Sequence, residues 1–150
     1  MHTSKGCIEE IYLDDRRAAR LSCPAALVPA PGQYLMASSS SDTQAALSQP
    51  LFSAGTCPTG FFIAPPLPAH WLPGAELKLR GPLGHGFTLP GSARKVALIA
   101  WHLPGSRILA LLEPALAQKA SVVLLTDQHP ANLPSVLEIQ PLADAGGAAA

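Results

Sequence analysis

The segment from Gly81 to Phe87 is the part of the chain whose residue types could border a ligand. It places three glycines, Gly81, Gly84 and Gly86, within six residues, follows the first with Pro82 and ends on Phe87. Glycine allows backbone angles and close approaches that a Cβ atom forbids, while Pro82 would stiffen the turn. Such a loop could lie against a planar ligand, or it could be a tight connection between two parts of the fold.

Other reactive side chains do not gather into a recognisable site. Cys7, Cys23 and Cys57 are odd in number and far apart, unlike a disulfide framework or the close thiolate pairs of zinc and iron–sulfur sites. The five histidines include no pair four residues apart, and His85 stands out only because it lies in the glycine-rich segment. No side chain is an evident acid or base, so we predict neither catalytic residues nor metal ligands.

The composition predicts a folded protein and argues against two classes of partner. Hydrophobic residues make up 48% of the 150 residues and charged residues 13%, the opposite of the balance in disordered chains. The formal net charge is zero and no basic stripe is visible, which argues against nucleic-acid binding. No apolar run approaches the roughly 20 residues that cross a bilayer, and no secretion signal opens the chain. We expect a cytoplasmic protein.

The first part of the chain reads as short strands joined by turns. Prolines and glycines, 16 and 12 in number, punctuate short apolar runs. The strand-forming runs are 7–13, 33–36, 49–53, 60–64 and 76–80. Residues 17–23 are ambiguous, because alanine favours helix, and the serine-rich stretch 38–48 indicates a polar loop. This pattern predicts a small antiparallel β-rich half.

From about residue 92 the pattern changes to that of an α/β unit. Apolar strand candidates follow at 95–101, 121–126 and 136–139. The first of them is continuous enough to suit a strand buried on both faces, as in a parallel sheet. A helix over 107–119 has a broad apolar face, although Pro114 would kink it unless the helix begins near Glu113. Strand, helix and strand imply a right-handed parallel unit.

Three features occur in an order that resembles one family. They are Pro31-Gly32-Gln33-Tyr34, the glycine-rich segment after Leu79, and the apolar strand 95–101. Over residues 7–140 the chain resembles the ferredoxin-reductase-like proteins, and most closely the electron-transfer subunit of dihydroorotate dehydrogenase. The resemblance implies a β plus α/β fold class: a small antiparallel FAD-binding-type β-barrel followed by a truncated parallel βαβ, half of a nucleotide-binding domain. The implied divisions are 1–91 for the barrel, 92–143 for the α/β segment and 144–150 for a flexible tail.

The resemblance also implies where FAD would lie. The Arg-Pro-x-Ser motif of the family matches a stretch in which Gln49 replaces the arginine that pairs with the flavin pyrophosphate, and Phe52 or Ser53 takes the serine position. Glutamine donates a hydrogen bond but carries no charge. Arg80 or Arg94 is therefore expected to substitute for the missing arginine. The implied cofactor-binding residues are Gln49, Pro50, Leu51, Phe52, Ser53, Arg80, Gly81, Pro82, Leu83, Gly84, His85, Gly86 and Phe87.

Two further family anchors are altered in this chain. Where the family opens a helix whose amides bind pyrophosphate, residues 65–68 hold three prolines, and the Trp71 that follows is more typical of a core residue than of a stacking one. Where the family admits a nicotinamide nucleotide at a glycine-rich turn, only Gly105 remains, beside the bulky Trp101. Asp127 ends a strand where α/β ligands bind, but a structural role suits half a domain better. NAD(P) and an iron–sulfur cluster are both disfavoured.

Two functions from different classes fit these observations. In the first, the protein is an electron-transfer-subunit-like flavoprotein module that binds FAD in the barrel and works within a larger oxidoreductase. In the second, it is a cofactor-free scaffold or assembly subunit derived from that family, acting through protein–protein contacts. Low charge and an open sheet edge favour the second, because an exposed edge strand invites pairing. Self-association through the α/β sheet edge would then make a homodimer.

Overall fold

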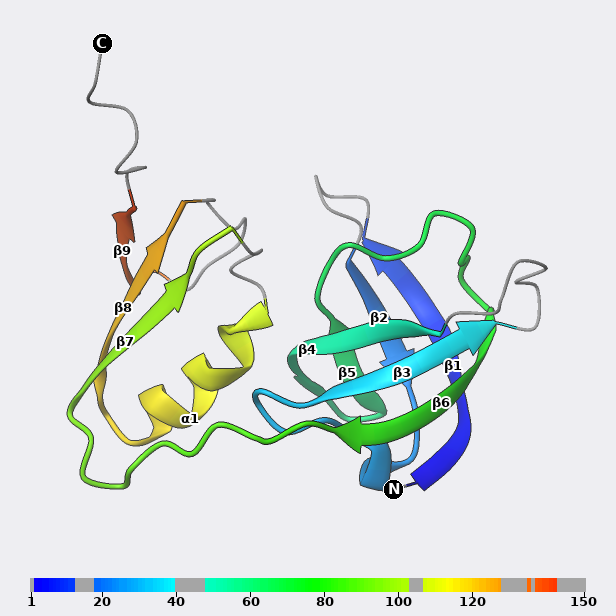
Figure 1. Cartoon of the computed structure of the whole chain (residues 1–150), viewed down its shortest axis with the longest axis horizontal. Coiled ribbons are helices and arrows are strands. Elements are labelled where there is room, and N and C mark those ends of the chain that lie inside the picture. The colour runs from blue at the N-terminus through cyan, green and yellow to red at the C-terminus, as the bar shows by residue number, and fades with distance from the viewer. Residues whose placement is uncertain are drawn as a thin grey trace, which may run out of the picture. The chain divides into compact units, whose positions relative to one another are not determined.

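The computed structural model describes residues 2–12, 18–39, 48–102, 107–127, 135 and 137–142. The chain divides into two compact units, with the boundary between Phe87 and Thr88. Figure 1 shows the strands of the first unit wrapped into a barrel and those of the second beside one helix. The predicted fold class, an antiparallel barrel followed by a short parallel α/β sheet, is confirmed.

The first unit is a closed six-stranded barrel in the order β1-β2-β5-β4-β3-β6, with every neighbouring pair antiparallel. Its elements are β1 (His2–Tyr12), β2 (Ala18–Ser22), a 3-10 turn η1 (Ala25–Leu27), β3 (Tyr34–Ser39), β4 (Gln49–Cys57), β5 (Gly60–Ile63) and β6 (Glu76–Leu83). Successive side chains of a strand point to opposite faces, so each strand lends alternate residues to the interior. The interior is filled by large apolar side chains, among them Ile8, Leu21, Leu35, Phe61, Leu79 and Trp71.

Strands β2, β3 and β6 are among those that differ from the sequence-based expectation. The ambiguous stretch is strand β2, because Ala19 and Leu21 are fully buried at alternate positions while their neighbours are partly exposed. Strand β3 runs on through Ser38 and Ser39, which the serine-rich composition assigned to a loop. Strand β6 runs on to Leu83, so the first part of the glycine-rich segment is strand rather than connection. Pairing of β3 with β6 along both extensions outweighs local composition.

The second unit is a three-stranded parallel sheet in the order β7-β8-β9. Its elements are β7 (Lys95–Ala100), a 3-10 turn η3 (Leu109–Leu111), helix α1 (Leu112–Ala117), β8 (Ser121–Thr126) and β9 (Glu138–Pro141). The helix is shorter than the predicted 107–119, and it begins at the later of the two expected starts. Pro114 lies in the first turn, where a missing amide hydrogen breaks no helical bond.

Burial in this sheet corrects one prediction. The face toward α1 is closed by Leu98, Leu124, Leu112 and Ala115. On the opposite face the side chain of Ile99 is 61% exposed. Strand β7 is therefore not buried on both faces within the described residues, because its exposed and buried positions alternate in its second half.

Candidate functional site

The two glycine-bearing motifs of the first unit lie against each other. The Phe87 backbone N–H donates to the Pro31 carbonyl at 2.8 Å, and the Gln33 Nε2 atom donates to the Gly84 carbonyl at 3.4 Å. A Cβ atom on Gly32 would lie 2.6 Å from the Phe87 ring and 2.9 Å from its backbone nitrogen. Gly32, with φ of +88°, is therefore the residue that lets the loop close onto the start of β3. The Phe87 ring lies beside Gly32 and remains 59% exposed.

The other glycines of this segment allow close packing on β3. A Cβ atom on Gly81 would lie 2.6 Å from the Leu35 side chain, and Gly81 itself is buried within β6. At Gly84 the nearest atom to such a Cβ would be Cε1 of the Tyr34 ring, at 3.4 Å. Because Gly84 has no Cβ atom, only backbone borders this edge of the Tyr34 ring.

Strand β3 lies between β4 and β6, as Figure 1 shows. This order brings outward-facing residues of both predicted segments onto one surface. Tyr34 pairs with Phe52 of β4 on one side and with Leu83 of β6 on the other. The Tyr34 and Phe52 rings lie 5.7 Å apart between centroids, at 35°, within the range of favourable aromatic contacts. We call Tyr34, Phe52 and Leu83 the aromatic platform.

The next outward row on the same surface carries a cation. Met36 pairs with Pro50 on β4 and with Arg80 on β6. Arg80 is exposed, and no residue within the described ranges pairs with its guanidinium. Arg94, the other expected substitute for the missing arginine, belongs to the second unit, where its Nη1 atom donates to the Gly91 carbonyl at 3.4 Å.

The remaining β4 residues predicted to bind cofactor lie at inward positions. Leu51 is 1% exposed and belongs to the barrel core. Gln49 pairs with the buried Ala37, so its side chain is on the inward side of β4. It is nevertheless exposed, because Gln49 is the first residue of the strand, at the rim of the barrel. Ser53 is 5% exposed, and its hydroxyl is held at 3.2 Å by both backbone polar groups of Gly55 at a β-bulge. The residue of this motif that faces outward beside Tyr34 is therefore Phe52.

The proline-rich segment between β5 and β6 contains no helix, although all of its residues are described. Pro65 and Leu67 are buried, and the Trp71 backbone N–H bonds to the Pro68 carbonyl at 3.1 Å. Trp71 is 0% exposed and fills the barrel core. This segment contributes apolar volume to the interior rather than a row of free amides.

In the second unit the carboxyl ends of β7 and β8 meet. The backbone nitrogen and the Nδ1 atom of His102 both lie 3.1 Å from Oδ2 of Asp127. Asp127 thus holds the turn that follows β7, whose residue 102 has a positive φ of 53°. Gly105, the remaining glycine of the expected nucleotide turn, lies outside the described residues.

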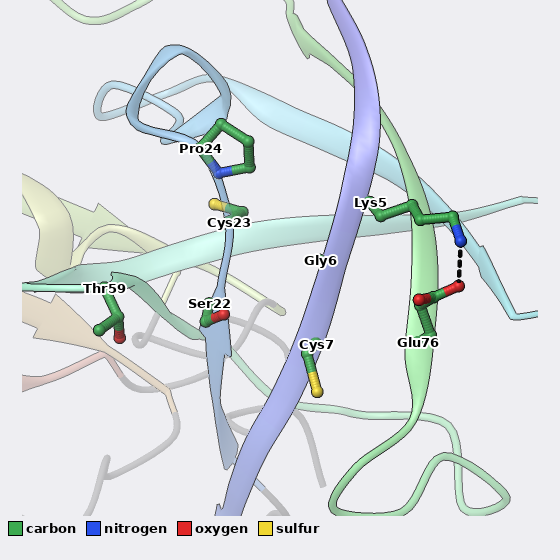
Figure 2. Close-up of a pocket in the computed structure, with 8 residues that line it drawn as sticks. All are labelled: Lys5, Gly6, Cys7, Ser22, Cys23, Pro24, Thr59 and Glu76. Atoms are coloured by element: carbon green, nitrogen blue, oxygen red, sulfur yellow. Dashed lines mark hydrogen bonds and ion pairs between the residues drawn. The ribbon is translucent and has the colours of Figure 1, made fainter.

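Figure 2 shows residues that line a pocket on the barrel wall, where Cys7 belongs to β1 and Cys23 directly follows the neighbouring strand β2. Burial, and to a lesser degree the nearby Cys57 thiol, raises the pKa of Cys23 from 9.0 to about 11. The thiol form is therefore favoured, which makes Cys23 a poor nucleophile near neutral pH. No three His, Cys, Asp or Glu side chains within the described part of the chain are grouped so as to hold a metal ion.

Comparison with known proteins places this fold. No family model and no curated protein matches the sequence. Among solved structures, the ferredoxin reductase in carbazole 1,9a-dioxygenase aligns with a TM-score of 0.69 at 20% identity, over 93% of this chain and 49% of that one. Its FAD apo form aligns with a TM-score of 0.72 at 18% identity, over 97% and 52%. An Amycolatopsis cytochrome P450 reductase aligns with a TM-score of 0.66 at 16% identity, over 93% and 51%.

The protein thus has a ferredoxin-reductase-like fold, as the motif order predicted, and it spans about half the length of these reductases. The finer resemblance to the dihydroorotate dehydrogenase subunit stays a prediction. No helix within the described residues is long and apolar enough to cross a membrane.

Proposed function

We propose that this protein is a flavin-binding electron-transfer module that carries FAD on the outer face of its barrel, as part of a larger oxidoreductase. The observation that carries the proposal is the aromatic platform, where Tyr34 and Phe52 lie side by side with Arg80 one row away. A flavin needs a flat apolar contact for its ring and a cation for its phosphate. This surface offers both on adjacent rows of one sheet.

The residues present fit such a group. The half-buried rings of Tyr34 and Phe52 would contact the isoalloxazine, and bare backbone at Gly84 would allow a ring edge to approach closely. Arg80 would bind a phosphate of FAD in place of the arginine that Gln49 replaces, since a guanidinium forms strong charge-assisted hydrogen bonds with phosphate. When bound, the flavin supplies the one- and two-electron chemistry, and the protein sets its position and surroundings. No protein side chain is assigned a proton-transfer role.

The electron donor in this proposal is a protein partner rather than NAD(P)H. The bulky Trp101 follows β7 at the position where a nucleotide phosphate would need close backbone approach. The partner would be a further subunit of the same oxidoreductase, and an iron–sulfur cluster is not proposed in this chain.

The first test is the visible absorption spectrum of gently purified protein, with any released compound identified after heating. We expect flavin bands, or their appearance after addition of FAD. Arg80→Gln should weaken FAD binding about tenfold or more, because a hydrogen bond to a charged group is lost. Arg94→Gln is the matched control and should bind FAD as the parent does. Failure to bind FAD, FMN or riboflavin would end the proposal.

A second candidate, the cofactor-free scaffold, is favoured by one observation. Ile99 is 61% exposed on the sheet face opposite α1, and β7 has no strand on its outer edge within the described residues. Another copy or another chain could pair with that edge. A colourless protein that does not bind added flavin and that forms a concentration-dependent dimer would support the scaffold function instead.

A further inference from the structure

The outward rows beyond the aromatic platform become basic and hydroxyl-rich. Strand β6 lies between β1 and β3. One row past Arg80, Lys78 is flanked by Lys5 of β1 and by Ser38 of β3. These side chains help to line a pocket of about 450 Å³, whose walls are Thr3, Ser4, Lys5, Ser38, Ser39, Glu76 and Lys78. We call this the β6 pocket.

The charges of the β6 pocket are not balanced by the protein. Lys5 and Lys78 are directly opposite in register, and like charges in that arrangement destabilise a sheet. The Lys5 ammonium lies 2.6 Å from the Glu76 carboxylate. Figure 2 draws this ion pair as a dashed line. Lys78 has no partner within the described residues. A bound anion beside Lys78 would relieve this repulsion, although the carboxylate of Glu76 at the pocket wall would oppose it.

The β6 pocket lies two outward rows along the sheet from the aromatic platform. Tyr34, Met36 and Ser38 are successive outward residues of β3, and each step of two residues advances about 6.6 Å. On β6, Arg80 and Lys78 follow the same order. A flavin whose ring lay on the aromatic platform and whose side chain ran along these rows would bring its phosphate to Arg80 and then to Lys78, where cations and hydroxyls are present.

We infer that the β6 pocket is an anion site that receives a phosphate group of the flavin, with Lys78 as its principal cation and Ser38 as a hydroxyl donor. This inference rests on the proposed function for its ligand. It places the phosphate on β6 and β3, rather than on the matched β4 motif and the segment after β5, which here offer the uncharged Gln49 and three prolines, of which Pro65 is buried. Lys5 contributes less, because Glu76 already engages it.

The test compares two probes that differ by one phosphate. Riboflavin and FMN share the same ring, so their affinity ratio isolates the phosphate contact. We expect the parent protein to bind FMN at least tenfold more tightly than riboflavin, measured by quenching of flavin fluorescence at low salt. Lys78→Gln should lose most of that ratio while leaving riboflavin affinity unchanged. Lys95→Gln, which removes an exposed lysine of the second unit, is the matched control and should keep the ratio.

A separate titration keeps this inference distinct from the proposed function. Inorganic phosphate added to the full chain should shift the amide NMR signals of Ser38 and Lys78, and the shifts should be lost in Lys78→Gln. If none of riboflavin, FMN and FAD binds, the proposed function fails while the phosphate titration still tests the pocket. If riboflavin binds but FMN binds no better, or if Arg80→Gln abolishes the ratio and Lys78→Gln does not, the inference is overturned.

Discussion

Two aromatic residues separated by 18 positions in the sequence become neighbours through the pairing of β3 with β4. We expect Phe52→Ala to weaken flavin binding roughly fivefold, because an aromatic contact is worth about 1 kcal/mol. The matched control is Phe62→Ala, which removes a ring that lies 6.3 Å from Tyr12 elsewhere on the barrel. Fluorescence titration with riboflavin measures both variants. Equal affinity losses would show that the aromatic platform has no special role.

Gly32 and Gly74 allow the cost of backbone strain to be measured apart from the cost of a steric clash. Gly32 and Gly74 have φ of +88° and +86°, but a new Cβ atom meets Phe87 at 2.6 Å in the first case and nothing within 4 Å in the second. Gly74→Ala should cost about 1 kcal/mol in free energy of unfolding from left-handed strain alone. Gly32→Ala should cost about 1–3 kcal/mol more. Urea unfolding of both variants checks the difference, and similar losses would contradict the proposed packing of Phe87 on Gly32.

The buried thiol of Cys23 predicts a pH dependence of stability. Its folded-state pKa of about 11 lies above the ordinary value of 9.0, so the folded protein holds this proton more tightly than the unfolded chain does. The stabilisation is complete below pH 9 and is lost as the pH rises toward 11. Cys23→Ala should therefore show a flatter decline of the urea midpoint between pH 9 and 11 than the parent. Parallel curves for the two proteins would refute this assignment.

At the scale of elements, local sequence pattern predicts strands well where apolar and polar residues alternate. The run 76–80 alternates and is strand, but β6 continues to Leu83 through Gly81 and Pro82, which local rules assign to turns. It continues because β3 supplies partners along its length. Ser38 and Ser39 are strand for the same reason. Pairing with a distant strand is a tertiary effect that no window of sequence contains.

In the candidate site, too, local sequence pattern identified some residues and pairing between distant strands brought in the others. The sequence indicated the glycine-rich segment and the β4 motif, and it left open whether Phe52 or Ser53 takes the key position. Strand register sets Phe52 outward and Ser53 inward, which sequence alone does not reveal, and the flavin contact of either residue stays a prediction. Tyr34 was noted only within its motif, and Lys78 was not singled out at all. The alternation of Lys78 with Leu77 and Leu79 indicated that Lys78 is exposed. That Lys5 and Ser38 lie beside Lys78 follows only from the pairing of β6 with β1 and β3.

The two faces of strand β7 give a test at this scale. Leu98 is 6% exposed toward α1, whereas Ile99 is 61% exposed on the opposite face. Leu98→Ala should cost about 2–4 kcal/mol in free energy of unfolding, and Ile99→Ala should cost less than about 1 kcal/mol, since most of its surface already meets water. Urea unfolding at two protein concentrations measures both. A large, concentration-dependent cost at Ile99 would mean that another chain covers this face.

At the scale of the whole molecule, the chain divides into two units after Phe87. Both halves of the proposed flavin site, the aromatic platform and the β6 pocket, lie in the first unit. A fragment ending at Phe87 has its own closed barrel and core, so we expect it to fold and to bind riboflavin within about twofold of the full chain. Circular dichroism and fluorescence titration test this. A folded fragment without riboflavin affinity would mean that the second unit supplies part of the site.

Barrel closure also has a consequence for synthesis on the ribosome. Lys5 of β1 pairs with Lys78 of β6, 73 positions later in the chain. At a translation rate of about 5–20 residues per second, roughly 4–15 s pass between the synthesis of Lys5 in β1 and the synthesis of Lys78 in β6. During that interval β1 has one unpaired edge, whose inward residues include the fully buried Ile8. The newborn chain is therefore most vulnerable to misassembly before β6 emerges, and changes that slow translation between β1 and β6 should lower the yield of soluble protein.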